Sequence, residues 1–174
     1  MKKALFIISV FIFAMACKNK DNTHSKTSKS DRKVCELVTE EEIKDLLAIP
    51  KGEVTKMEEA APTQPTCFYT WESVIYIKTM NISGRDLDLE YPAKASIVLV
   101  ENANEGMYQA SIKAYKEPQV ESGIGDMAIW GTNLSQITFL AKGNLVHVNV
   151  QVTSDAKENR DKAMQLAKLV IDRL

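Results

Sequence analysis

A strict alternation of residues near the C-terminus constrains the fold more than any other feature of the sequence. Across residues 145–152, valine occupies every second position, and the positions between hold Leu145, His147, Asn149 and Gln151. Successive side chains of a strand point to opposite faces, so one face of this segment is apolar and the other is mostly polar. Strands with one covered face are typical of antiparallel sheets. The sequence therefore predicts an antiparallel sheet with helices packed on one face.

Other strands are indicated by runs of aromatic and β-branched residues. Residues 67–80 and 94–102 are expected to form two of them. Residues 120–152 are expected to form three more, because Gly131 and Gly143 mark two turns of a β-meander. In this meander Ile137 and Phe139 belong to the apolar face.

Three helices are expected around these strands. The first follows Thr39 and Glu42, which have the spacing of a capping box, and it stops before Pro50. The others lie within residues 102–118 and 154–174, where apolar residues recur at helical spacing. Residues 51–66, with two prolines, are expected to be a loop. The predicted order is α-β-β-α-β-β-β-α, an α+β fold.

The first 17 residues are organised like an export signal. Lys2 and Lys3 precede an apolar run over residues 4–15, which suits a signal peptide and is shorter than the ~20 residues of a membrane-spanning helix. Small residues then precede Cys17 in the sequence Ala-Met-Ala-Cys. This stretch resembles the lipobox of bacterial lipoproteins. The resemblance implies that residues 1–16 are a signal peptide and that Cys17 is acylated. The alternatives are an ordinary signal peptide with a coincidental cysteine, or an uncleaved anchor.

The residue after Cys17 bears on the destination of such a lipoprotein. In the familiar sorting rule an Asp at this position retains the protein in the inner membrane, and here the residue is Lys18. The resemblance therefore implies the outer membrane. "CKNKDN" also resembles the Lys/Asp-bearing signals with which some bacteria place lipoproteins on the cell surface. We expect a lipid-anchored protein of the bacterial cell envelope, either periplasmic or surface-exposed.

Charge divides the rest of the chain into two parts. Residues 18–33 have no aliphatic or aromatic residue and carry six Lys/Arg and two Asp, a net charge of +4. We expect this segment to be a flexible basic tether with a typical reach of ~20–24 Å. Residues 34–174, expected to be one domain, carry 14 basic and 21 acidic residues, a net charge of −7. This balance excludes the class of nucleic-acid-binding proteins.

Cys35 and Cys67 are the two cysteines that remain in the domain. In an oxidising envelope a disulfide is the simplest interpretation. A metal site is the alternative, but the only other strong soft ligand in the domain is His147. We therefore predict a disulfide, no metal and no cofactor.

Two short motifs suggest ligands and also have simpler interpretations. Asp86, Asp88 and Glu90 place carboxylates at every second position, but the turn glycine and the terminal Glu of an EF-hand loop are missing. A plain acidic edge strand or loop is the simpler interpretation. Gly123, Gly125 and Asp126 suggest a phosphate loop, but no Lys-Ser/Thr follows. Here the favoured interpretation is a structural turn that needs glycine backbone.

Several motifs occur along the domain in a fixed order: Cys35-Glu36-Leu37-Val38-Thr39, Cys67-Phe68-Tyr69-Thr70-Trp71, Gly123-Ile124-Gly125-Asp126-Met127-Ala128, Lys142-Gly143-Asn144 and the closing helix. In these motifs the domain resembles a family of small bacterial lipoproteins, largely of unknown function, and the related extracytoplasmic sensor domains of receptor Ser/Thr kinases. The kinase sensor domains have a second disulfide, which this chain cannot form.

Enzymatic chemistry has little support in the sequence, because His147 is the domain's only histidine and belongs to no nucleophile or zinc motif. We expect a non-catalytic domain that binds a small molecule, a glycan or a protein. The alternative is an inhibitor or immunity protein that binds a toxin or envelope hydrolase. The binding surface is expected on the uncovered sheet face, or at its rim at residues 81–94. Alternation assigns Ile75 and Ile77 to the core and gives this face Tyr76, Lys78, Thr138, His147, Asn149 and Gln151.

Overall fold

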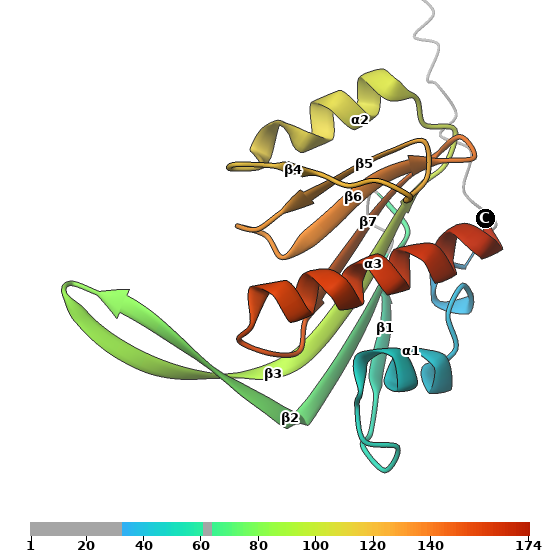
Figure 1. Cartoon of the computed structure of the whole chain (residues 1–174). Helices are drawn as coiled ribbons and strands as arrows, with labels where there is room; N and C mark the ends of the chain where they lie inside the picture. The colour runs from blue at the N-terminus through green and yellow to red at the C-terminus, as the bar shows by residue number, and fades with distance from the viewer. Residues whose placement is uncertain (1–32, 61–63) are drawn as a thin grey trace, which may run out of the picture.

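Seven strands form one antiparallel sheet in the order β1-β2-β3-β7-β6-β5-β4 (Figure 1). The structure, a computed structural model, describes residues 33–60 and 64–174. The strands are β1 (Lys56–Ala60), β2 (Thr66–Ile82), β3 (Arg85–Val100), β4 (Gln119–Val120), β5 (Met127–Gly131), β6 (Gln136–Ala141) and β7 (Asn144–Gln151). The expected α+β class and antiparallel sheet are confirmed, and the cleanly alternating segment is β7.

Two helices cover one face of this sheet. α1 (Glu40–Leu47) packs against α3 (Ala156–Arg173), which lies over β6 and β7. The core lies beneath them and contains the valines of β7 together with Ile137 and Phe139. Trp71 is fully buried there, and its indole N–H donates to the Thr55 hydroxyl at 2.8 Å. Trp71 is therefore a core residue.

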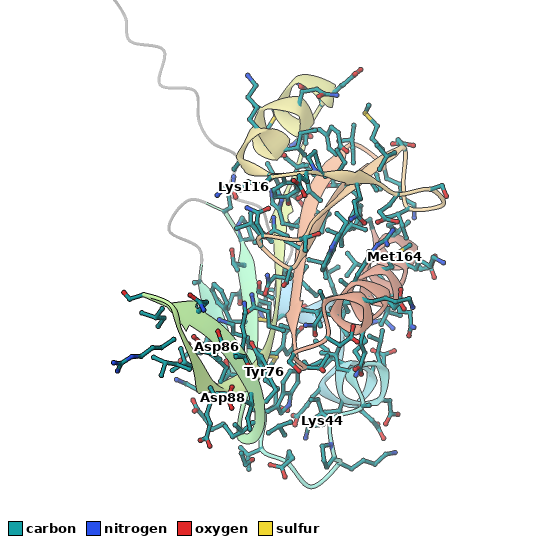
Figure 2. All side chains as sticks on the ribbon, turned by 60° about the vertical axis from the view of Figure 1, so that its left-hand side comes forward. Lys44, Tyr76, Asp86, Asp88, Lys116 and Met164 are labelled. Carbon is teal, nitrogen blue, oxygen red and sulfur yellow. A yellow bond between two sulfur atoms is a disulfide. The ribbon has the colours of Figure 1, made fainter. Side chains whose placement is uncertain are left out.

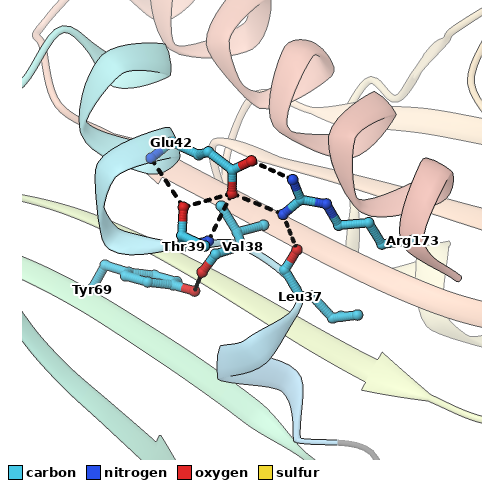
Figure 3. A network of polar contacts seen from close by, with 6 residues as sticks. All are labelled: Leu37, Val38, Thr39, Glu42, Tyr69 and Arg173. Atoms are coloured by element: carbon cyan, nitrogen blue, oxygen red, sulfur yellow. Dashed lines mark hydrogen bonds and ion pairs between the residues drawn. The ribbon is translucent and has the colours of Figure 1, made fainter.

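The start of α1 is fixed by the capping box that the sequence predicts (Figure 3). The Glu42 backbone N–H donates to the Thr39 hydroxyl at 3.3 Å, and the Thr39 N–H donates to the Glu42 carboxylate at 3.0 Å. Arg173, at the end of α3, pairs with the same carboxylate and donates to the Leu37 carbonyl. Arg173 and Thr39 together lower the pKa of Glu42 to about 2. This network ties the two helices to each other.

The third helix lies on the opposite face of the sheet, which corrects the expectation that all helices share one face. α2 (Glu105–Ser111) continues into the 3₁₀ turn η2 (Ile112–Ala114), and Tyr115 follows. The ring of Tyr115 lies against Gly131, where a Cβ atom would come within 2.8 Å of it. The helical periodicity shows that this helix has an apolar side, but it does not say which face of the sheet that side covers.

The element order also differs in detail from the expected one. β1 lies within residues 51–66, which were expected to be a loop, and the two-residue strand β4 precedes the meander. β1 pairs with the aromatic part of β2, with Met57 opposite Tyr69. β1 consists of Lys, Met, Glu and Ala, which are not typical strand residues. Its extended conformation therefore depends on its pairing with β2.

An irregularity in β2 reverses the expected faces of its second half. Trp71 pairs with Ala93, but Ile75 pairs with Pro92, so three residues of β2 have no partner on β3. An odd number of extra residues moves every later side chain to the other face of the sheet. The assignment of Ile75 and Ile77 to the core is therefore wrong, and their side chains are 47% and 54% exposed. Tyr76 and Lys78 are likewise not on the face that carries His147.

The disulfide predicted from the sequence is present. Cys35, in the 3₁₀ turn η1 (Val34–Glu36), is bonded to Cys67 at the start of β2, and their Cα atoms are 5.0 Å apart. Cys67 is fully buried. The bond therefore attaches the first described turn of the chain to β2, next to the edge strand β1.

The Gly-Ile-Gly-Asp segment forms a turn that leads into β5. Gly123 and Gly125 have φ angles of +74° and +55°. A Cβ atom at Gly125 would come within 2.4 Å of the Leu140 carbonyl oxygen, to which the Asp126 N–H donates at 2.7 Å. Both the φ angle and the close approach require glycine at position 125, which accounts for the motif without a bound phosphate.

Candidate functional site

The second half of β2 and the first half of β3 extend beyond the rest of the sheet as a two-stranded ribbon (Figure 1). Residues 75–82 pair with residues 85–92, whereas β1 pairs with β2 only as far as Thr70 and β7 pairs with β3 only from Lys94. We call residues 75–92 the β2–β3 arm. Its two strands therefore pair only with each other.

A two-residue turn closes the arm. Ser83 and Gly84 have φ angles of +54° and +81°, as tight hairpins of type I′ require. The Gly84 N–H donates to the Asn81 side-chain oxygen at 3.1 Å. The expected loop over residues 81–94 is therefore the tip and one strand of a hairpin.

The two faces of the arm differ in chemistry. Residues directly opposite each other in an antiparallel pair share a face. One face, which we call the tyrosine face, carries Tyr76, Lys78, Met80, Ile82, Arg85, Leu87, Leu89 and Tyr91. The other, which we call the acidic face, carries Ile75, Ile77, Thr79, Asn81, Asp86, Asp88, Glu90 and Pro92. Figure 2 shows Tyr76, Asp86 and Asp88 on the arm.

Contacts between side chains order both faces. On the tyrosine face the rings of Tyr76 and Tyr91 stack with their centroids 5.9 Å apart, and the Tyr91 hydroxyl lies 3.6 Å from the Met80 sulfur. On the acidic face Thr79 donates to Asp88 at 2.7 Å, and Asn81 donates to Asp86 at 2.8 Å. These two carboxylates are thus engaged by neighbouring side chains. Within the described residues no group of three or more metal-binding side chains occurs.

Large apolar side chains are exposed along the whole arm. Ile75, Ile77, Met80, Ile82 and Leu87 are between 38% and 54% exposed. A two-stranded hairpin without further packing is marginally stable in water. Exposed apolar residues that gather in one place mark an interaction surface more often than scattered ones do. The arm is therefore the strongest candidate for a binding element in the described part of the chain.

A second candidate is a polar cluster beneath η2 on the face opposite α1 and α3. It joins His147 on β7, Thr138 and Gln136 on β6, and Tyr115 after η2. His147 Nδ1 lies 2.6 Å from the Thr138 hydroxyl and 3.3 Å from the Gln136 side-chain nitrogen. That nitrogen donates to the Tyr115 hydroxyl at 2.6 Å, and the Tyr115 and Thr138 hydroxyls are also hydrogen-bonded.

The environment of the cluster disfavours protonation of His147. Burial lowers the pKa of His147 and raises the pKa of Tyr115. With its ring proton on Nε2, the neutral imidazole can accept at Nδ1 from the Thr138 hydroxyl or the Gln136 amide nitrogen. Thr138 is fully buried. The polar groups of the cluster therefore satisfy one another beneath Tyr115.

The stability of the domain is expected to decrease as pH falls below about 6.5, because the unfolded chain protonates His147 at its ordinary pKa and the folded chain resists protonation. His147→Asn keeps an acceptor near the Nδ1 position and removes the titration. Urea unfolding from about pH 7 to about pH 5 should show a smaller loss of stability in this variant. His24 is present in both proteins and cancels. Equal slopes in the two proteins would contradict the assignment.

The remaining residues of the predicted binding face are separated by the structure. Asn149 and Gln151 share the His147 face of β7, and the Asn149 amide donates to the Leu134 and Ser135 carbonyls at 2.5 and 3.1 Å. Gln151 is half-buried opposite Lys94. Tyr76 lies apart from them on the arm. Thr138 was expected to be uncovered and is instead buried beneath Tyr115.

A hollow beside α1 offers little for a ligand. Its walls are Glu40, Glu41, Lys44, Asp45 and Lys51. The Lys44 ammonium is already held by the Glu53 carbonyl at 2.5 Å and by the Glu40 carboxylate at 2.7 Å. The charged groups of this hollow thus stabilise the helix and the following turn.

Comparison of the chain with protein-family models, curated proteins and solved structures found no match. The arm and the polar cluster are therefore interpreted from their own chemistry. The sequence does contain a signal for the arm. Ser83-Gly84 is a turn dipeptide, and apolar residues alternate on both sides of it, at Met80, Ile82, Leu87 and Leu89. None of the described helices is long and apolar enough to cross a membrane.

Proposed function

We propose that this chain is a bacterial lipoprotein, anchored through acylated Cys17, whose domain binds a partner through the β2–β3 arm without catalysing a reaction. The observation that carries the binding function is the exposure of five large apolar side chains on an arm whose strands pair only with each other. Exposing such residues to water is unfavourable by about 25 cal/mol for each Å² of apolar surface, and a partner would relieve this cost.

The envelope location in this proposal is supported by the chemistry of the cysteines. Disulfides persist in oxidising compartments outside the cytoplasm. Cys35 and Cys67 form one, and Cys17 lies in the lipobox-like sequence outside the described residues. Lys18 after Cys17 supports delivery to the outer membrane. The chain would then consist of a signal peptide, a basic tether over residues 17–33 and the domain at 34–174.

The non-catalytic part of the proposal is supported by His147. Its ring is half-buried, neutral and hydrogen-bonded to Thr138 and Gln136. A general base must reach a substrate proton and titrate near the working pH. Burial moves the pKa of His147 away from that range, and Tyr115 covers the nearest hydroxyl.

Crosslinking in envelope vesicles tests the binding function. The wild-type lipoprotein should crosslink to a partner through a photoreactive residue in place of Met80. The variant Ile82→Ser with Leu87→Ser, carrying the same photoreactive residue, should lose most of the product, because two exposed apolar contacts are removed. A matched control is a photoreactive residue in place of Phe68, which is 42% exposed but outside the arm.

Equal labelling from positions 80 and 68 would contradict the role of the arm. Crosslinks in the lipid fraction and in the protein fraction are scored separately. If the only crosslinked protein were one basic enzyme, in a one-to-one ratio with this chain, the chain would instead be an inhibitor of that enzyme. The net charge of −7 on residues 34–174 is complementary to a basic enzyme.

A further inference from the structure

We propose that the tyrosine face of the β2–β3 arm is a membrane-contact surface that lies on anionic lipid headgroups. This inference deepens the proposed function and rests on it, because it names the chemistry of what the arm binds. The occupant we infer is a bilayer rather than a protein.

The distribution of charge on the arm supports this assignment. The charged residues of the tyrosine face are Lys78 and Arg85, and both are cations. The three carboxylates of the arm, Asp86, Asp88 and Glu90, all lie on the acidic face. Among residues 33–60 and 64–174, the ion pairs are formed by other side chains, and neither Lys78 nor Arg85 takes part in one. An apolar face whose charges are all positive is complementary to an anionic, apolar interface.

The order of side chains along the tyrosine face also fits a bilayer surface. The Ile82–Arg85 pair lies next to the turn at the tip, and the Met80–Leu87 and Lys78–Leu89 pairs follow it. The stacked Tyr76 and Tyr91 rings lie at the base, where the arm joins the sheet. Aliphatic residues bury in the acyl region, whereas tyrosine favours the headgroup level with its hydroxyl near water. The tip would thus enter the interface and the tyrosines would lie at its boundary.

A second copy of this chain fits the face less well. A stable interface between proteins takes about 20–30 residues from each side, and the tyrosine face has eight positions. In a face-to-face dimer, Lys78 and Arg85 of both copies would also be brought together without carboxylates between them. Like charges brought close together in this way are unfavourable.

The acidic body of the domain does not prevent this contact. Residues 34–174 carry a net charge of −7, but at physiological salt charges are screened beyond about 8 Å. The arm extends from the sheet (Figure 1), so its tip can touch an anionic surface while most of the acidic body lies farther away than this screening distance. A tether of 16 residues spans up to about 55 Å when extended, so the anchor permits such an orientation.

Residues 33–174 contain the described core and the disulfide of the domain, so we expect this fragment to fold on its own and to permit a lipid-free test. Among those residues every buried side-chain nitrogen and oxygen has a hydrogen-bond partner. Using this fragment also removes the acyl chains and the basic tether, each of which would bind vesicles on its own.

The test is cosedimentation of oxidised 33–174 with vesicles of phosphatidylcholine alone or mixed with phosphatidylglycerol. Binding is expected to the mixed vesicles and to weaken with salt. Ile82→Ser with Leu87→Ser should reduce the partition coefficient at least about tenfold. Ile75→Ser with Ile77→Ser, on the acidic face of the arm, should lose less binding than this pair. The matched control, Val54→Ser with Val120→Ser, removes exposed apolar residues outside the arm and should change binding less than about twofold.

The cations are tested in the same assay. Lys78→Gln and Arg85→Gln should each reduce binding to the mixed vesicles about fivefold, and neither should alter binding to phosphatidylcholine alone. Glu90→Gln is the control on the acidic face. A further variant, Ile82→Trp, adds an exposed indole to a chain whose two tryptophans are buried. Its fluorescence should shift to the blue and be quenched by brominated lipids.

Four results would overturn the inference. Equal losses from the serine pairs on the two faces of the arm would show that the tyrosine face has no special role. A dimer that Ile82→Ser with Leu87→Ser dissociates, without vesicle binding, would identify a second copy as the occupant. Crosslinks from position 80 to a protein, again without vesicle binding, would overturn the lipid assignment and leave the proposed binding function standing. If neither crosslinks nor vesicle binding depended on the arm, both proposals would be wrong.

Discussion

Cys17→Ser is expected to abolish processing and lipid attachment completely. The thiol of Cys17 would carry the diacylglycerol, and residues 1–33 contain no other cysteine. The precursor should therefore keep the lysines and apolar run of residues 1–16, run larger on gels and fail to incorporate labelled palmitate. In detergent phase separation the wild-type protein should enter the detergent phase as a smaller, labelled species.

Two matched variants make this result specific. Cys35→Ser removes a cysteine of the disulfide instead and should leave palmitate labelling unchanged. Lys18→Asp should keep the label and move the protein from the outer to the inner membrane fraction, as the sorting rule implies. Normal cleavage and labelling of Cys17→Ser would contradict the lipobox interpretation and, with it, the anchored part of the proposed function.

Local features of the fold were predictable because the residues that determine them are neighbours in sequence. Thr39 and Glu42 are three residues apart, and this spacing alone predicts the capping box that the structure contains. The alternation of valines over residues 146–152 predicts their burial, and the structure buries Val146, Val148 and Val150 completely. The pairing of Cys35 with Cys67 followed from the expected compartment and the absence of other cysteines in the domain.

Features that depend on a partner strand were not predictable in the same way. The alternation of β2 continues in sequence through Ile75 and Ile77, so it predicts that both lie on the same face as Trp71. Their actual face depends on the pairing of Ile75 with Pro92, which leaves three β2 residues unpaired. Nothing within β2 encodes that choice. The face that α2 covers is likewise decided by the fit of Tyr115 against Gly131.

The error in β2 changes the candidate site. If the alternation had continued, Tyr76 would have joined His147, Asn149 and Gln151 on one polar face. Instead the polar face is partly covered by Tyr115, and its side chains largely satisfy one another. Residues 75–92 also extend beyond the reach of β1 and β7, so they pair only with each other. The candidate binding element is therefore the apolar arm rather than the polar face.

Removing the disulfide by Cys35→Ala with Cys67→Ala is expected to lower the free energy of unfolding by about 3–4 kcal/mol. The bond joins residues 32 positions apart in sequence, and closing a loop of that length restricts the unfolded chain. Urea unfolding of residues 33–174 in oxidising buffer measures the loss. The tether and anchor are absent from this fragment and contribute nothing to the difference.

Reduction of the wild-type domain supplies the internal comparison for this double variant. With a reducing agent present, wild-type stability should fall to about the level of the double variant, and the double variant itself should not respond. Any difference in unfolding free energy between the reduced wild type and the double variant measures the packing of the two thiols. Cys67 is fully buried. If the oxidised wild type and the double variant unfolded at the same urea concentration, the bond would not constrain the chain. The disulfide would then add no stability that depends on an oxidising envelope.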